Sequence, residues 1–103
     1  MAEPTLVQQA IDSVQGLVDM VPENHRDEMK LLVKDLEEAK STLFVRTAEA
    51  KPMLERCVRA AEALKEAAGA PDWSDTAEVA YGDLERAVSK LRNTILVRTQ
   101  RAT

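Results

Sequence analysis

Apolar residues recur every seven positions through the middle of the chain. The repeat falls on Met29, Leu36, Leu43, Ala50, Cys57 and Leu64. It passes through Pro52 without a change of phase. A period close to seven keeps one stripe of each helix facing its neighbours, and is typical of helices that pack side by side. The pattern therefore predicts an all-α fold built from packed amphipathic helices.

The first predicted helix covers residues 5–21. Thr5 followed by Gln8 matches a capping box, in which side chains at a helix start satisfy free backbone N–H groups. The apolar residues that follow share one helical face: Val7, Ala10, Ile11, Val14, Leu17, Val18 and Val21. Pro22 disfavours helical geometry at the residue before it and suits the first turn of a new helix. We therefore expect a tight turn near residues 21–24.

The second and third predicted helices cover residues 23–47 and 52–69. The inner face of the 23–47 helix consists of Met29, Leu32, Val33, Leu36, Ala39, Leu43 and Phe44. The inner face of the 52–69 helix consists of Leu54, Cys57, Val58, Ala61, Leu64 and Ala68. Gly69 and Pro71 then stop the helix, because glycine is common just past a helix end and proline cannot continue one.

The fourth predicted helix covers residues 75–98. Ser74 or Asp75 is expected to cap it, and Glu78 is expected to form a capping box with Asp75. Its inner face consists of Ala77, Ala80, Tyr81, Leu84, Ala87, Val88, Leu91 and Ile95. From Arg86 onward the chain has five basic residues and no acidic one, which suits the negative end of a helix dipole.

Pro52 leaves two architectures open. If it lies in the first turn of a helix, the chain forms an antiparallel up-down bundle of four helices. If residues 23–69 form one long helix kinked at Pro52, the chain has three helices, and the continuous seven-residue phase is explained directly. A proline inside a helix costs about 3 kcal/mol, whereas a proline at a helix start costs little. We therefore favour the four-helix bundle.

The composition fits a single helical domain over residues 1–103. The chain is 45% hydrophobic but only 3% aromatic, so leucine, valine and alanine are expected to form its core. It is acidic, with a net charge of −4, which argues against nucleic acids and acidic membranes as partners. Its longest apolar runs, such as residues 31–33, are far shorter than the roughly 20 residues of a membrane span.

The sequence predicts a cytoplasmic location. The chain has one cysteine and so cannot form an internal disulfide. Residues 1–5 lack the basic region and the apolar run of an export signal. We therefore expect the protein to stay in the compartment where it is made.

No residue is predicted to be catalytic or to bind a metal or a cofactor. His25 is the single histidine, so a site built from two histidines is excluded. Its position near a helix start predicts a residue that partly covers Met29. Cys57 falls on the apolar repeat, where a thiol acts as a small core residue, and no base is expected beside it. We therefore expect that the protein is not an enzyme.

A resemblance supports an alternative function. Residues 11–18, Ile-Asp-Ser-Val-Gln-Gly-Leu-Val, are similar to the opening helix of the small all-helical chorismate mutases. The resemblance implies a helical enzyme or ligand-binding bundle with a cavity lined by arginines and carboxylates. The chain departs from that family at two points. Gln8 or Gln9 stands where the family has an arginine, and Pro22 interrupts a helix that the family keeps long.

The favoured hypothesis is a non-enzymatic protein-protein interaction module, such as an adaptor, an assembly subunit or a small inhibitor. Helical projection places several apolar residues on outward faces, and Trp73 lies in a loop where it either plugs the bundle end or anchors a partner. The candidate interface residues are Leu31, Val45, Trp73, Val79, Leu96 and Val97. The expected occupant is a partner protein or a second copy of the chain.

Overall fold

The computed structural model describes residues 5–68 and 73–101, and every regular element within these ranges is a helix. The elements are α1 (Leu6–Gln15), α2 (Glu23–Lys40), the short 3-10 helix η1 (Phe44–Arg46), α3 (Ala50–Ala68) and α4 (Asp75–Arg101). The prediction of an all-α bundle with four α-helices is therefore confirmed. Predicted features at residues 69–72, including the stop after α3, lie outside the described residues.

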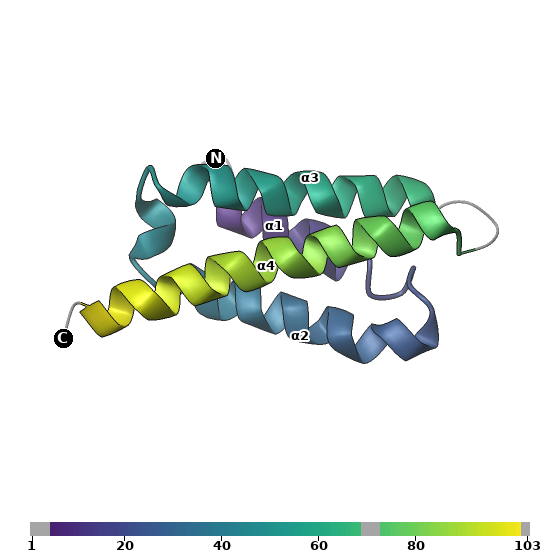
Figure 1. Ribbon diagram of the computed structural model, residues 1–103, viewed down its shortest axis with the longest axis horizontal. Helices are drawn as coiled ribbons and strands as arrows, with labels where there is room; N and C mark the ends of the chain where they lie inside the picture. Colours follow the sequence, from purple (N-terminus) through teal and green to yellow (C-terminus); the bar gives the residue numbers. More distant parts are fainter. Residues whose placement is uncertain (1–4, 69–72, 102–103) are drawn as a thin grey trace.

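Consecutive α-helices run in opposite directions, as expected for an up-down bundle (Figure 1). The helices that pack side by side are α1 with α2, α1 with α3, α2 with α4, and α3 with α4. In this arrangement α2 and α3 lie at opposite corners of the bundle. The segment between them therefore crosses one end of the bundle, and η1 in its middle contacts both helices.

The core contains residues of all four α-helices and of the turn after α1. Its larger members are leucines and valines, together with Ile11, Met29, Tyr81 and Ile95. Alanines and Cys57 fill the close contacts between helices. Burying one leucine or valine side chain stabilises a fold by about 1.5–3 kcal/mol. The many such side chains from every helix explain how a chain with few aromatic residues forms a stable core.

Helix α1 is shorter than predicted. Thr5 caps it as expected, because its hydroxyl oxygen accepts the N–H of Gln8 at 3.2 Å. The helix ends at Gln15, and the chain continues as turns, in which the N–H groups of Leu17, Val18 and Met20 donate to carbonyls three residues before them. A proline ring collides with the carbonyl four residues before it, so Pro22 prevents helical geometry from reaching residue 22. Leu17 and Val21 remain buried in the turn segment.

Helix α2 ends at Lys40 rather than at residue 47. The hydroxyl groups of Ser41 and Thr42 both donate to carbonyl oxygens three residues before them, at 2.7 Å. These hydroxyl groups bond to carbonyl oxygens of the last helical turn, and such local bonds compete with continuation of the helix. The 3-10 helix η1 follows after a short turn.

Pro52 is the third residue of α3, which begins at Ala50. The first turn of a helix leaves its N–H groups without intrahelical partners, so a proline there removes no bond. The alternative of one long helix over 23–69 kinked at Pro52 is therefore wrong. The continuous seven-residue phase arises because α2 and α3 both face the core.

One member of the seven-residue repeat is not buried. Leu43 is 78% exposed, whereas the other members lie in the core. It follows the end of α2, where the backbone no longer holds the helical direction, and Phe44 beside it is only partly buried. The prediction that Leu43 lies on an inner helical face is therefore wrong.

Helix α4 is the longest element, and it continues three residues beyond its predicted end. Its start is capped by Ser74, whose hydroxyl oxygen accepts the N–H of Ala77 at 3.2 Å. Glu78 does not form the predicted box with Asp75 but contacts His25 of α2 and the indole N–H of Trp73. The last turns of α4 extend past the neighbouring helices (Figure 1). None of the helices in the described ranges is apolar enough over a sufficient length to cross a membrane.

Candidate functional site

The six predicted interface residues divide into two groups. Leu31, Val79, Leu96 and Val97 are exposed. Val45 and Trp73 are partly buried against the core. Val45 belongs to η1 and lies beyond the end of α2, so it does not share a helix with Leu31 as the predicted helix 23–47 implied. Three of the four exposed residues belong to α4.

The exposed apolar residues of α4 lie opposite its buried face. Val79 near the helix start is 62% exposed, and Leu96 and Val97 near its end are 49% and 48% exposed. An α-helix has 3.6 residues per turn, so Val79 and Val97 lie one above the other, about five turns apart. We call this side of α4 the outward face, made up of Val79, Gly82, Arg86, Ser89, Asn93, Leu96 and Val97. It runs along most of the helix.

The middle of the outward face is polar, with the long side chain of Arg86 between the small residues Gly82 and Ser89. Gly82 and Ser89 occupy it, and a Cβ atom at Gly82 would meet only the Arg86 guanidinium, at 3.7 and 3.8 Å. An open groove of about 550 Å³ follows the C-terminal half and is lined by Arg86, Lys90, Asn93 and Val97 among others. The small residues Gly82 and Ser89 allow another backbone to approach the helix closely at their positions.

The charges of α4 separate along its length. Its four acidic residues come first: Asp75, Glu78, Asp83 and Glu85. Its basic residues follow: Arg86, Lys90, Arg92, Arg98 and Arg101. Exposed ion pairs join Arg86 to Asp83 at 2.5 Å, Arg92 to Asp35 at 3.9 Å, and Arg98 to Glu49. Exposed pairs of this kind contribute at most about 1 kcal/mol each, so these side chains can exchange ion-pair partners at little cost.

A second apolar surface lies at the end of the bundle. Leu43, Phe44 and Ile95 line a groove of about 580 Å³ between η1 and α4. Arg98 and Glu49, which pair with each other, stand at its edge. This end groove adjoins the groove along the outward face, because Arg98 lines both, but its Ile95 side lies on the buried side of α4.

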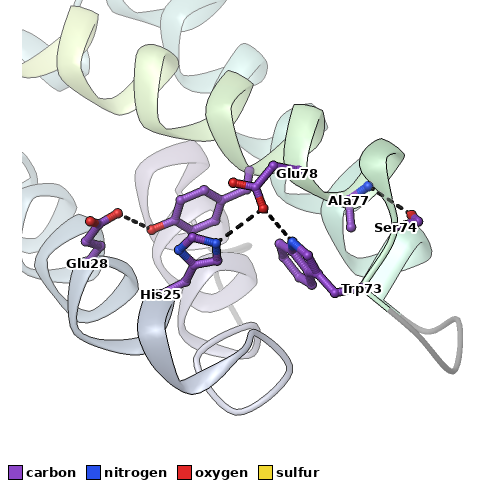
Figure 2. A network of polar contacts seen from close by, with 7 residues as sticks. His25, Glu28, Trp73, Ser74, Ala77 and Glu78 are labelled. Carbon is purple, nitrogen blue, oxygen red and sulfur yellow. Dashed lines mark hydrogen bonds and ion pairs between the residues drawn. The ribbon is translucent and has the colours of Figure 1, made fainter.

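The main polar cluster joins the start of α2 to the start of α4 (Figure 2). His25 Nε2 lies 3.2 Å from Glu78 Oε2, and the indole N–H of Trp73 donates to the same oxygen at 2.5 Å. The hydroxyl of Tyr81 donates to Glu28 Oε2 at 2.7 Å. The imidazole of His25 stacks on the Tyr81 ring, with a centroid distance of 4.4 Å, and the Trp73 ring meets Tyr81 edge-on.

The cluster shifts the pKa values of its members Glu78 and Tyr81 and of the neighbouring Glu85. The hydrogen bond from Trp73, assisted by His25, lowers the pKa of Glu78. Burial raises the pKa of Tyr81, and the hydrogen bond to Glu28 raises it further. Partial burial, together with the negative charge of Glu28, raises the pKa of Glu85. The hydroxyl of Tyr81 is therefore held neutral, and the carboxylate of Glu78 is held ionised.

The geometry of this cluster points to a structural clasp. Trp73 and Tyr81 each donate to a carboxylate within the cluster, and the rings pack on one another. Such contacts fix Trp73, just before α4, against the first turn of α2. Of the two roles that the sequence left open for Trp73, the end plug agrees with its partial burial. The sequence gave no sign that His25 contacts Tyr81. The two residues lie far apart in sequence, and periodicity reports only on neighbours along one helix.

Cys57 lies where the repeat predicts. Its side chain is fully buried, and burial raises the pKa of the thiol to about 11. A thiol with a raised pKa is a poor nucleophile, because the thiolate is the reactive form. Cys57 therefore acts as a core residue.

The alternative of a cavity lined by buried arginines is not supported by the described part of the chain. No charged side chain is buried there. Arg26, which is partly buried, donates to the carbonyl of Val18 and so stabilises the turn after α1. Within the same ranges, no group of three or more histidine, cysteine, aspartate or glutamate residues is placed to hold a metal ion.

Comparison with known proteins returns no match, whether to a family model, to a curated protein or to a solved structure. Functional inference therefore depends on the surfaces of the molecule itself.

Proposed function

We propose that this chain is a non-enzymatic protein-protein interaction module that binds an α-helix of its partner along the outward face of α4. The observation that carries the proposal is the exposure of Val79, Leu96 and Val97 on the side of α4 opposite the core. Scattered exposed apolar residues are common on protein surfaces and need no explanation. Here they stand at both ends of one helical face, which gives them a shared geometry.

A helix is the occupant that this face fits. Its outward positions recur at intervals of three and four residues, which is the spacing that a second helix meets when it packs alongside. Gly82 and Ser89, on either side of Arg86, leave room for the partner helix to approach α4 closely. The apolar ends would supply most of the binding energy, and the charged flanks would select the partner.

The other properties of the chain support this proposal over the small enzyme. The described core is apolar, and the clasp at His25 uses its polar groups to hold helices together. The net charge of −4 disfavours nucleic acids and acidic membranes as partners. The single cysteine is buried and forms no disulfide, which fits a module acting in the cytoplasm.

Photo-crosslinking tests the proposal. Leu96 is replaced by benzoylphenylalanine, and Arg59 on α3, whose side chain is 80% exposed, is replaced in the same way as the control. We expect a discrete adduct from position 96, none from position 59, and loss of the adduct when Val79→Glu is added. Circular dichroism confirms that each variant is folded. Adducts of equal yield from both positions, or from neither, would refute the proposal.

A further inference from the structure

The charge order of α4 is complementary to itself when the helix is reversed. Every acidic residue of α4 precedes every basic one. Two copies of α4 that pack in opposite directions therefore place the acidic half of each against the basic half of the other. Two copies that pack in the same direction place acidic against acidic and basic against basic.

We propose that the occupant of the outward face is the α4 helix of a second copy of this chain, packed antiparallel about a two-fold axis at the level of residues 87 and 88. This inference rests on the proposed function and names the partner. A two-fold interface uses the same surface on both copies, so each attractive contact occurs twice.

The outward face follows a seven-residue repeat that specifies the layers of this pairing. Val79, Arg86 and Asn93 occupy one set of positions, and Gly82, Ser89 and Leu96 occupy the other. Antiparallel packing of such a face brings a residue of one set against a residue of the other set on the partner. The outer layers then join Val79 to Leu96 of the second copy, and the inner layers are small or polar.

Flanking charges strengthen this register. Residues beside the layers form the interhelical ion pairs of paired helices. In the antiparallel register, Asp83 meets Lys90 of the second copy, and Glu85 meets Arg92 of the second copy. Each pair occurs twice because of the two-fold axis. The two inner layers each pair Arg86 with Ser89 of the second copy and lie next to each other, so the two Arg86 side chains come near each other. The Asp83 carboxylate, 2.5 Å from Arg86, offsets their repulsion.

The neighbouring registers are excluded by the same charges. A shift of seven residues one way places Asp83 against Asp83 and Glu85 against Glu85 of the second copy. A shift of seven residues the other way places Lys90 against Lys90 and Arg92 against Arg92. Like charges directly opposite one another oppose association, so one register remains.

Disulfide trapping tests both the pairing and its direction. Val79→Cys and Leu96→Cys are prepared as separate proteins, and Leu31→Cys on α2, which is 57% exposed, is the control. In the proposed dimer, residue 79 of one copy lies about 25 Å from residue 79 of the second copy, which is too far for a disulfide, and the same holds for residue 96. Residue 79 of one copy lies directly opposite residue 96 of the second copy. An equal mixture of the Val79→Cys and Leu96→Cys proteins should therefore give a crosslinked dimer on mild oxidation.

The separate proteins, and either one mixed with Leu31→Cys, should give at least fivefold less crosslinked product. Crosslinking of Val79→Cys with itself at the level of the mixture would show a parallel arrangement and overturn the inference. Equal products from every mixture, or none from any, would also overturn it. If no mixture gives a crosslinked product, the photo-crosslinking experiment separates this inference from the proposed function. A photo-crosslinked adduct at position 96 that contains a different protein would leave the proposed function standing.

Discussion

Val79 and Val97 lie on one line along α4, five helical turns apart, and both side chains are about half exposed or more. The opposite side of the same helix is buried against α2 and α3. A helix that is apolar at both ends of its exposed side is equipped to pack on two sides. This relationship connects the fold to the proposed function.

Substitution of Gly82 separates folding from association. Gly82→Ala should raise the stability of the dilute protein by about 0.5–1 kcal/mol, because glycine is a poor helix former and the added Cβ meets only ordinary contacts. The same methyl group should lower the yield of the disulfide-trapped dimer, because it stands between two close helices. Urea unfolding at low concentration and the trapping assay measure the two effects. A higher dimer yield would contradict the proposed packing.

The cap of α4 gives a prediction about stability alone. Ser74→Ala removes the oxygen that accepts the N–H of Ala77 and should destabilise the protein by about 1 kcal/mol. Ser74→Asp retains an accepting oxygen and should stay close to the natural chain. Thermal or urea unfolding measures both variants. Equal stability of all three proteins would show that the cap is not formed.

The clasp predicts a weakening in acid. The pKa of Glu78 is lower in the folded chain than its ordinary value of 4.5, so Glu78 stabilises the fold above that value. Its contribution is lost as the pH falls through the folded pKa. The stability difference between the natural chain and Glu78→Gln should therefore shrink from pH 6 to pH 3. Glu62→Gln, at an exposed position of α3, is the matched control, and an equal change in both differences would contradict the role of Glu78.

The clasp also predicts a weakening in alkali. The pKa of Tyr81 is raised above its ordinary value of 10.0 in the folded chain, so folding favours the neutral hydroxyl. Its contribution is present below pH 10 and is lost as the pH rises toward the folded pKa. Tyr81→Phe, which removes the hydrogen bond to Glu28, should cost about 1 kcal/mol at pH 7 and less above pH 10. A cost that stays constant up to pH 11 would contradict this assignment.

Cys57 gives a second effect in alkali. Burial raises the pKa of its thiol from 9.0 to about 11, so the neutral thiol stabilises the fold below pH 9 and this contribution declines between pH 9 and 11. Cys57→Ala should lose about 1 kcal/mol near neutral pH and show a shallower decline over that range. A thiol reagent should modify the natural chain only as fast as it unfolds. Rapid modification of the folded protein would show that Cys57 is accessible.

The sequence predicted the helices and most of the core because the apolar period of a helix is a local property. It did not predict the end of α2, because hydroxyl groups of Ser41 and Thr42 bond to the backbone in place of another helical turn. Leu43, which was predicted to lie in the core, is therefore exposed.

The outward face and the clasp differ in how much the sequence reveals. Projection on a helix was enough to place Val79, Leu96 and Val97 on the outer side of α4. The contact between His25 and Tyr81 depends on how α2 and α4 pack together, which no pattern along one helix records. The order of acidic and basic residues along α4 was visible in the sequence. That two antiparallel copies of α4 would have complementary charges could be inferred only once the outward face was known.

Sedimentation velocity of charge-exchanged chains tests most directly whether the outward face of α4 is an interface. Asp83→Lys and Lys90→Asp each place like charges opposite one another in the antiparallel pair, whereas the double exchange restores opposite charges. We predict that the natural chain and the double exchange sediment as dimers at high protein concentration and low salt, and that both single variants sediment as monomers. Identical sedimentation of all four proteins would contradict the account.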